Sequence, residues 1–216
     1  DPFILAAKVM LRLIADVKEQ TGYEVPELNL GGGFGIQYVA EDKPAAYDDY
    51  MKQVSNALKQ AADEWKIKLP FVLIEPGRSI AGPAGLTLYT VGAVKNIPNI
   101  RTYVSVDGGM TDNPRYALYQ SVYDMEIANK VGMEKTTTVT VAGKCCESGD
   151  LLGEHVPLQP AQGGDILAVL ATGAYNYSMA SHYNRTPGLP VVMVNGEKSR
   201  VIVKRETLED LIRNDV

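Results

Sequence analysis

Cysteine, histidine and tryptophan are scarce in this sequence: its 216 residues include two Cys, two His and one Trp. The two cysteines, Cys145 and Cys146, are adjacent, and neighbours rarely form a disulfide with each other. This excludes a disulfide framework and makes a reducing compartment, the cytoplasm, the simplest expectation. His155 and His182 are isolated, so no Cys/His set has zinc spacing and we expect no metal site.

Long apolar runs and an excess of basic residues are also missing. No run approaches the roughly 20 apolar residues of a membrane span, and the start at Asp1 lacks the basic segment of a secretory signal. The net charge of -5 argues against nucleic acid or an anionic membrane as a partner. Because the chain begins without Met and inside a predicted helix, we expect it to be part of a longer protein.

Residues 1–82 alternate between helix-forming and strand-forming segments. Apolar residues at helical spacing predict helices at Phe3–Glu19 and Tyr47–Trp65. Apolar runs predict strands at Glu27–Leu30 and Phe71–Ile74, the second of them buried. This order predicts a parallel sheet covered by helices. A complete eight-unit barrel needs about 250 residues, so we expect this segment to form part of a (β/α)8 barrel.

Residues 83–216 follow a different pattern, in which short β-prone runs succeed one another. The pattern predicts an antiparallel β domain, either a barrel or a sandwich. Asn195–Gly196 is a hairpin signal, and Thr207 with Asp210 forms a potential capping box for a final helix ending at Ile212. The predicted strands are Leu86–Val94, Thr102–Val106, Thr136–Val141, Ile166–Leu170, Val191–Val194 and Arg200–Val203.

Two polar motifs directly follow the predicted strands of residues 1–82. Gly31–Gly35 reads Gly-Gly-Gly-Phe-Gly, which would let backbone N–H groups approach a phosphate but would equally suit a tight turn. Glu75-Pro76-Gly77-Arg78 suits a structural salt bridge. Alternatively, Arg78 and Gly77 bind an anion, and Glu75 faces a cation or a protonated ring nitrogen. In barrels of this class, sites form at the C-terminal ends of strands.

Three further motifs lie in residues 83–216. Cys145–Asp150 reads Cys-Cys-Glu-Ser-Gly-Asp, and acidic neighbours would raise a thiol pKa, which suits a proton donor better than a nucleophile. Asp107–Met110 and the residues up to Tyr116 are expected to be loop. Arg115 and Tyr119 could share one helical face, with solvated surface as the alternative. The aromatic segment around Tyr175 could contact a cofactor or simply pack.

The order of these motifs resembles the diaminopimelate decarboxylases, pyridoxal-phosphate (PLP) enzymes of the alanine-racemase-like fold class. The resemblance extends over essentially the whole chain, and Cys146-Glu147-Ser148-Gly149-Asp150 is its most specific string. It implies an α/β plus β fold, the C-terminal part of a PLP-binding (β/α)8 barrel followed by an antiparallel β-barrel or sandwich domain. It also implies decarboxylation of meso-diaminopimelate to L-lysine by a cytoplasmic homodimer with active sites at the interface.

The resemblance implies which residues would hold the cofactor. The backbone around Gly33 and at Gly77 and Arg78 would hold the PLP phosphate. Glu75 would pair with the pyridine nitrogen and keep it protonated, which makes the ring a stronger electron sink. Tyr175 would contact both PLP and substrate.

The resemblance implies substrate-binding residues as well. Arg78, Arg115 and Tyr119 would bind the substrate carboxylate, and Glu147 would hold the distal ammonium group. Cys146 would donate a proton after CO2 leaves, and both loop residues would act in the neighbouring subunit's site.

One feature of the family is missing from the sequence. The Schiff-base lysine lies in a Tyr-Ala-x-Lys-Ala-Asn-like string that does not occur here, so we expect a fragment that is inactive alone. Two alternatives stay open. The chain could come from a decarboxylase of another basic amino acid, or it could be a non-catalytic decoy module that pairs with an active homologue.

Overall fold

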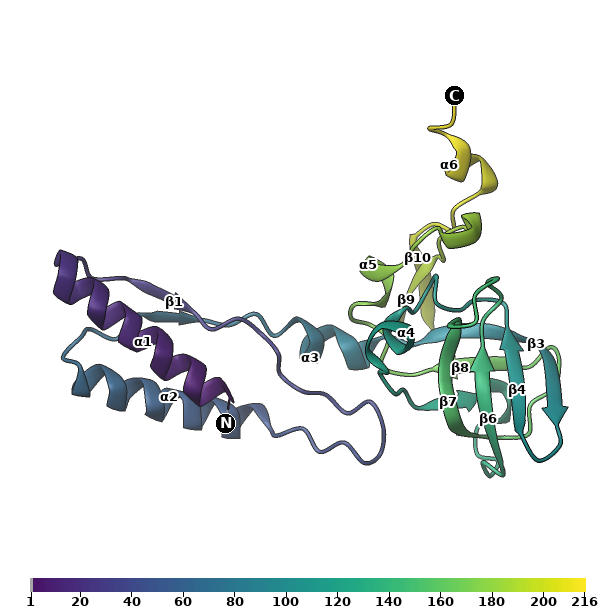
Figure 1. Ribbon diagram of the computed structural model, residues 1–216, viewed down its shortest axis with the longest axis horizontal. Coiled ribbons are helices and arrows are strands. Elements are labelled where there is room, and N and C mark those ends of the chain that lie inside the picture. The colour runs from purple at the N-terminus through teal and green to yellow at the C-terminus, as the bar shows by residue number, and fades with distance from the viewer. Residues whose placement is uncertain (1) are drawn as a thin grey trace. The chain divides into compact units, whose positions relative to one another are not determined.

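The computed structural model describes residues 2–216, so Asp1, where the predicted segment 1–82 begins, lies outside the described residues. Two compact units are present (Figure 1). The first unit extends to Gln37 and again from Glu41 to Ile80, and the second comprises Tyr38–Ala40 and Ala81–Val216. Within residues 2–216, none of the helices has the length and apolar character needed to cross a membrane.

The first unit alternates helices and strands as the sequence predicts. Its elements are α1 (Pro2–Thr21), β1 (Glu27–Asn29), α2 (Tyr47–Glu64), β2 (Phe71–Leu73) and the start of α3 (Gly77–Ala81). Strands β1 and β2 pair in parallel, with Leu28 opposite Val72. The helices pack on one face of these strands around a small core, whose buried residues are Ala7, Leu11, Ile14, Leu28, Val54, Leu58 and Ala61.

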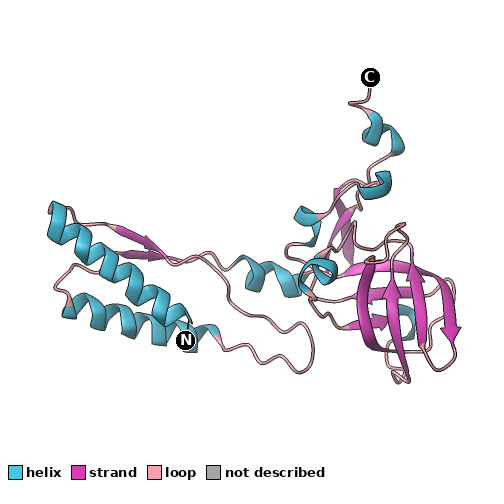
Figure 2. Ribbon diagram, in the orientation of Figure 1, coloured by secondary structure: helices cyan, strands magenta, loops and turns pink. Residues whose placement is uncertain are grey.

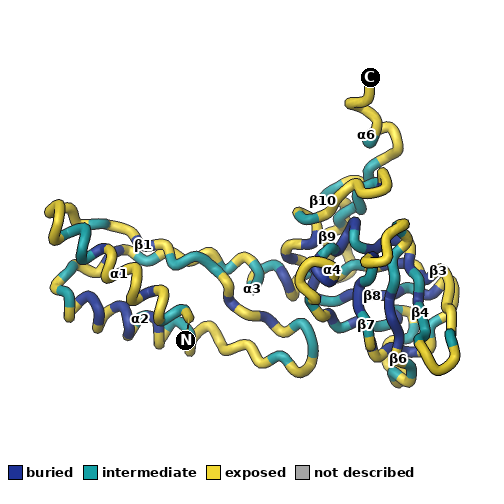
Figure 3. The backbone as a smooth tube through the Cα atoms, in the orientation of Figure 1, coloured by how far each residue is buried: buried dark blue, intermediate teal, exposed yellow. Residues whose placement is uncertain are grey.

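The expectation that Phe71–Ile74 is buried is wrong. Phe71 is 69% exposed and Leu73 is 37% exposed, whereas Leu28 on the neighbouring strand is buried. Successive side chains of a strand point to opposite faces, and within residues 2–216 only one face of this sheet is covered by α1 and α2. Figure 3 shows the resulting series of buried positions along α2.

The second unit contains a sheet whose strands are magenta in Figure 2. It has six strands in the order β5-β8-β3-β4-β6-β7. The strands are β3 (Thr87–Ile97), β4 (Arg101–Val106), β5 (Met125–Ile127), β6 (Thr137–Ala142), β7 (Leu151–Leu158) and β8 (Ile166–Val169). This confirms the predicted β domain, with one difference: β4 and β6 pair in parallel. The long connection between them allows this, because parallel neighbours need a crossover of a dozen or so residues.

The interior of this sheet is built by alternating apolar residues from all six strands. The buried cluster comprises Tyr89, Val91, Val104, Val106, Tyr123, Met125, Ile127, Val139, Val141, Leu152, Val156, Leu158, Leu167 and Val169. The sequence analysis missed β5, which is short, and β7, where Gly153 and Pro157 interrupt the apolar alternation. A proline is tolerated in β7 because this strand ends the sheet order.

The rest of the second unit consists of short elements. These are α4 (Arg115–Tyr119), α5 (Asn176–Met179), β9 (Val191–Asn195), β10 (Lys198–Val203), α6 (Leu208–Ile212) and 3-10 turns at Gly82–Ala84, Ala128–Lys130 and Tyr183–Arg185. The predicted hairpin is confirmed, because β9 and β10 pair antiparallel and Gly196 in the turn has a φ of 58°. The predicted capping box of α6 is also confirmed by reciprocal bonds between Thr207 and Asp210.

Candidate functional site

The two motifs of the first unit meet at one edge of its sheet, because they follow parallel strands. The Glu75 N–H donates to the carbonyl oxygen of Gly31 at 2.8 Å. A Cβ atom on Gly32 would collide with the Glu75 carbonyl group, so this approach requires glycine. Gly31 and Gly33 also have φ values of 70° and 98°, which glycine adopts without strain.

The carboxylate of Glu75 is oriented by Asn29, which the sequence analysis missed. The Asn29 side-chain amide donates to Glu75 Oε1 at 2.6 Å, and Asn29 Oδ1 accepts from the Gly31 N–H at 2.7 Å. One side chain thus connects the glycine loop with the acidic motif. A polar residue between Leu28 and Leu30, at the end of a strand, is the signal that could have identified it.

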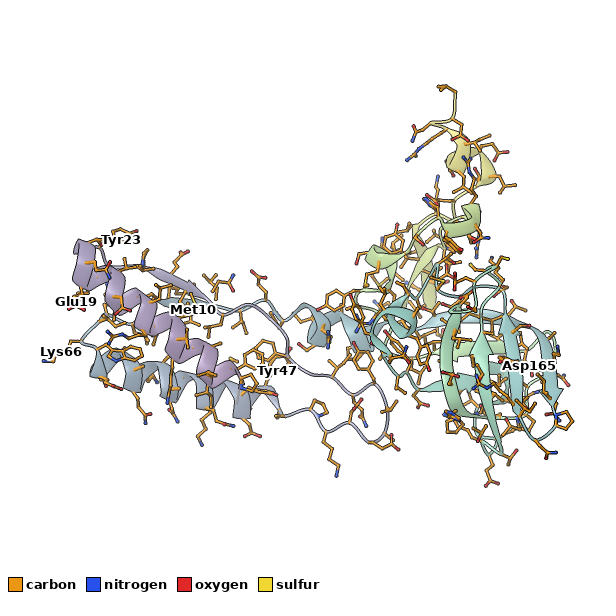
Figure 4. All side chains as sticks on the ribbon, viewed as in Figure 1. Met10, Glu19, Tyr23, Tyr47, Lys66 and Asp165 are labelled. Atoms are coloured by element: carbon orange, nitrogen blue, oxygen red, sulfur yellow. The ribbon has the colours of Figure 1, made fainter. Side chains whose placement is uncertain are left out.

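Aromatic packing fixes the far side of the glycine loop. Phe34 is 3% exposed, and its ring lies 4.9 Å from Phe3 and 5.4 Å from Tyr47, measured between centroids. Tyr47, labelled in Figure 4, also forms a hydrogen bond with Ser79 through its hydroxyl group. Since Ser79 follows Arg78, this tyrosine holds both motifs of the first unit.

These residues fit a PLP molecule in chemical type. The glycine loop exposes its backbone at Gly33, and nothing lies within 4 Å of a Cβ built on Gly77, so a phosphate could approach both. Arg78 is half-buried and supplies a cation, while the exposed Glu75 carboxylate can accept from a protonated ring nitrogen. The exposed backbone and the cation therefore suit an anionic group of a ligand, and the carboxylate suits a protonated heterocycle of the same ligand.

In the second unit, Arg115 is the central residue of the predicted substrate site. It is 7% exposed, and its Nε donates to the Tyr123 hydroxyl at 2.8 Å. The guanidinium carbon lies 5.5 Å from the ring centroid of Tyr119 and 5.6 Å from that of Tyr175. Within residues 2–216, no carboxylate forms a salt bridge with Arg115. A buried cation without an anionic partner is costly, which makes Arg115 well suited to bind an anion.

The shared helical face of Arg115 and Tyr119 is confirmed. The expected loop up to Tyr116 is wrong at its end, because α4 starts at Arg115. The alternative that both side chains are solvated surface is wrong for Arg115, which is buried, whereas Tyr119 is 62% exposed. Interactions with distant strands fix α4: the Tyr116 hydroxyl donates to Glu154 at 2.9 Å, and Glu154 also pairs with Arg101 at 2.6 Å. The hydrogen bonds from Tyr116 and Arg101 lower the pKa of Glu154.

Cys146 and Glu147 lie on the exposed loop between β6 and β7. Glu147 Oε1 accepts from the Gly149 N–H at 3.0 Å, which closes the loop on itself. Burial and the nearby Asp150 carboxylate raise the pKa of the Cys145 thiol to about 11. The pKa of Cys145 therefore shifts in the expected direction, with burial as the main cause and Asp150 as the second.

The structure groups the predicted residues into clusters. The first unit gathers Gly33, Glu75, Gly77 and Arg78 at one sheet edge, and the second unit gathers Arg115, Tyr119 and Tyr175. Within residues 2–216, Cys146 and Glu147 form no hydrogen bond or ion pair with the Arg115 cluster. Tyr123, which orients Arg115, was missed because nothing in Ser121-Val122-Tyr123 distinguishes it. Residues 2–216 contain no group of His, Cys, Asp and Glu side chains arranged to hold a metal ion.

Comparison with known proteins adds a family match. Residues 13–173 match the model of the pyridoxal-dependent decarboxylase C-terminal sheet domain. The chain is 49% identical over 214 residues to a diaminopimelate decarboxylase of Halalkalibacterium halodurans, covering 99% of this chain and 49% of the relative. It is 46% identical over 214 residues to the diaminopimelate decarboxylase of Bacillus subtilis, with the same 99% and 49% coverage. The chain thus spans about half the length of these curated relatives.

A solved structure agrees with these relatives. The diaminopimelate decarboxylase of M. jannaschii in complex with L-lysine superimposes with a TM-score of 0.90 at 32% identity. The match covers 100% of this chain and 48% of that one. The resemblance inferred from the motif order is confirmed, and so is the fold class.

Proposed function

Because the chain belongs to the pyridoxal-dependent decarboxylase family, we propose that it forms part of a diaminopimelate decarboxylase, which converts meso-diaminopimelate to L-lysine and CO2. The observation that carries this proposal is the buried guanidinium of Arg115, which has no carboxylate partner within residues 2–216. The names of relatives 49% and 46% identical to the chain support the choice of substrate. So does a similar fold solved with L-lysine.

The first unit holds the cofactor in this proposal. The backbone of Gly33 and the Gly77–Arg78 segment bind the PLP phosphate, and Glu75 accepts a hydrogen bond from the pyridine nitrogen. Asn29 holds the Glu75 carboxylate in place through its 2.6 Å bond. PLP supplies the electron sink that decarboxylation requires.

The second unit reads the substrate. The planar fork of Arg115 suits a carboxylate, and the rings of Tyr119 and Tyr175 lie 5.5 and 5.6 Å from this guanidinium, next to the proposed carboxylate site. Arg78 contributes a second cation for carboxylate. Glu147 binds the distal ammonium group, which distinguishes diaminopimelate from substrates with a shorter or uncharged end.

The exposed loop acts across a dimer interface in this proposal. Cys146 gives a proton to the carbon atom that has lost CO2, and with Glu147 it reaches the active site of a second copy of the chain. Exposure of both side chains favours this arrangement. The free thiols of Cys145 and Cys146 favour a reducing compartment, the cytoplasm.

The test is a chimera in which this chain replaces the matching half of the Halalkalibacterium halodurans relative. We expect PLP-dependent CO2 release from meso-diaminopimelate. Glu147→Ala should raise the KM for meso-diaminopimelate by about 10- to 100-fold, as expected for a lost hydrogen bond to a charged group. The same variant should change the KM for a shorter monocarboxylate substrate very little.

Glu197→Ala, on the exposed turn between β9 and β10, is the matched control and should change the KM for neither substrate. Equal loss with both substrates in Glu147→Ala contradicts the distal-ammonium role. A chimera that releases CO2 only from another basic amino acid contradicts the proposed substrate.

A further inference from the structure

Asp150 joins the two loops that lie next to the substrate-side residues of the second unit. Its side chain is buried, with the residue 3% exposed. One carboxylate oxygen, Oδ1, accepts from the Met110 N–H at 2.6 Å, and the other, Oδ2, accepts from the Cys145 N–H at 2.7 Å. Its main-chain oxygen accepts from the Gly143 N–H at 2.8 Å. One residue therefore connects Asp107–Met110 with both ends of the β6–β7 loop.

The backbone on both sides is shaped around this carboxylate. A Cβ on Gly109 or on Gly143 would collide with the carboxylate oxygens of Asp150, so neither position has room for a side chain. Gly109 also has a φ of 150°, at the limit of the region that favours glycine. The Lys144 N–H donates to the Gly108 carbonyl at 3.0 Å, which adds a direct bond between the loops.

Each loop carries part of the proposed substrate site. The β6–β7 loop carries Cys146 and Glu147. The Asp107–Met110 loop continues into α4 through a tight turn. In this turn, the Asp112 and Asn113 N–H groups donate to the Gly109 carbonyl oxygen at 3.0 and 2.9 Å. Asn113 Oδ1 then accepts from the Arg115 N–H at 3.3 Å. A continuous series of hydrogen bonds leads from Asp150 to the residue that binds the substrate carboxylate.

We propose that Asp150 is a positioning residue that holds the Cys146–Glu147 loop in a fixed place on the second unit, and so sets where the two groups of that loop enter the neighbouring subunit's site. The identity of those groups rests on the proposed function. The tether itself rests on the geometry of Asp150. A fixed loop matters because Glu147 can bind the distal ammonium group of a substrate in the neighbouring site only if the loop holds it at the correct position.

Asp165 provides a matched control for the alternative that Asp150 only stabilises the fold. It is likewise 3% exposed, and it accepts from Lys130 at 2.6 Å and from the Gln162 N–H at 2.8 Å. Its partners lie in other loops of the same unit. Both residues are thus buried carboxylates of the second unit, but only Asp150 contacts the loops next to the site.

The first test is amide hydrogen exchange in the free chain. In Asp150→Asn, the amide NH2 group faces one of the two backbone N–H groups, so at least one of Met110 and Cys145 should exchange about 10- to 100-fold faster relative to the core amides of the strands. Asp165→Asn lowers the stability of the second unit as a whole, so it should accelerate Met110 and Cys145 no more than those strand amides. The tether is overturned if Asp150→Asn accelerates Met110 and Cys145 no more than the strand amides, or if both variants accelerate them equally beyond the strand amides. If Asp150→Asn does not fold, Asp150→Ser keeps one acceptor in a smaller side chain and should expose at least one of the two amides.

The second test uses the chimera described above. Asp150→Asn should raise the KM for meso-diaminopimelate about tenfold and leave the affinity for PLP unchanged, because the residues proposed to hold the PLP phosphate and ring nitrogen lie in the first unit. Asp165→Asn should leave the KM within about twofold. A KM for meso-diaminopimelate that stays within about twofold of the unmutated chimera overturns the proposal.

The two tests separate this inference from the proposed function. If exchange responds as expected but the unmutated chimera releases no CO2 from meso-diaminopimelate, the proposed function fails and the tether stands. If the chimera is active and Asp150→Asn changes neither exchange nor KM, the tether fails and the function stands.

Discussion

The two units hold their site residues by different means. In the first unit, the exposed Glu75 is oriented by a single side chain, Asn29, at the edge of a two-stranded sheet. In the second unit, Arg115 is 7% exposed and donates to the Tyr123 hydroxyl, and Asp150 is 3% exposed and accepts from two backbone N–H groups. This chain therefore holds its proposed substrate residues more firmly than its proposed cofactor residues.

The cores of the two units explain this difference. The first unit packs small residues such as Ala7 and Ala61 between its helices, and leaves Phe71 and Leu5 exposed at 69% and 65%. The second unit encloses large side chains such as Leu152 and Ile127. Because hydrophobic stabilisation scales with the apolar area removed from water, the second unit should be the more stable.

The largest expected effect comes from replacing one fully buried leucine by alanine in each of the two cores. Leu152→Ala in the second unit and Leu11→Ala in the first each remove a side chain that is 0% exposed, and each should cost about 3 kcal/mol of unfolding free energy. The single tryptophan, Trp65, lies in the first unit and reports on it alone. In denaturant titrations, Leu11→Ala should move the tryptophan fluorescence midpoint, and Leu152→Ala should move the far-UV circular dichroism transition of the strands.

The control is Leu118→Ala, which removes a side chain from a residue that is 60% exposed and should change stability by less than about 0.5 kcal/mol. If both core variants shift both probes by the same amount, the two units unfold as one. The proposed difference in stability between them would then be wrong.

The next effect concerns the buried ion pair of the second unit. Burial opposes ionisation of Asp165, but hydrogen bonds from Lys130 and Asn129 outweigh it and hold the pKa below the usual 3.8. A carboxyl whose pKa is lowered by folding stabilises the folded state above its unfolded pKa, and loses that contribution as pH falls through the folded pKa. Asp165, labelled in Figure 4, should therefore make the second unit acid-sensitive below about pH 4.

Asp165→Asn tests this contribution. The variant leaves Lys130 without its anion and should lose about 3 kcal/mol at neutral pH, and less as the pH falls below about 4. Urea titrations from pH 7 to pH 3, followed by circular dichroism, measure the difference. A constant gap between the variant and the unmutated chain over this range would rule out ionisation of Asp165 as the cause.

Local pattern and tertiary context account for what the sequence could and could not predict. Helices α1 and α2 and strands β1 and β2 were found because their apolar spacing is a local property, and Gly196 and Thr207 directly mark the β9–β10 turn and the α6 cap. The exposure of Phe71 could not be found, because burial depends on which layer covers a strand. The burial of Arg115 likewise depends on Tyr123 and Tyr175, which the fold brings to it.

The smallest expected effect on stability concerns the first unit, where a single side chain orients Glu75. Asn29→Ala removes the bonds to Glu75 and to the Gly31 N–H. Because these groups are exposed and water can replace the lost partner, the cost in unfolding free energy should be at most about 1 kcal/mol. The affinity of the chimera for PLP should nevertheless fall about tenfold, since Glu75 is no longer oriented. Titration with PLP, followed by its absorbance, measures this affinity.

Two further variants sharpen that result. Asn56→Ala, at an exposed position on α2, is the matched control and should leave the PLP affinity unchanged. Asn29→Asp keeps the acceptor for the Gly31 N–H but places a negative charge next to Glu75, so its affinity should fall at least as far as that of Asn29→Ala. If Asn29→Ala and Asn56→Ala bind PLP equally well, Asn29 does not orient Glu75 for the cofactor. The cofactor residues of the first unit would then be held by the backbone alone, and the contrast with the hydrogen-bonded side chains around Arg115 would be greater than proposed.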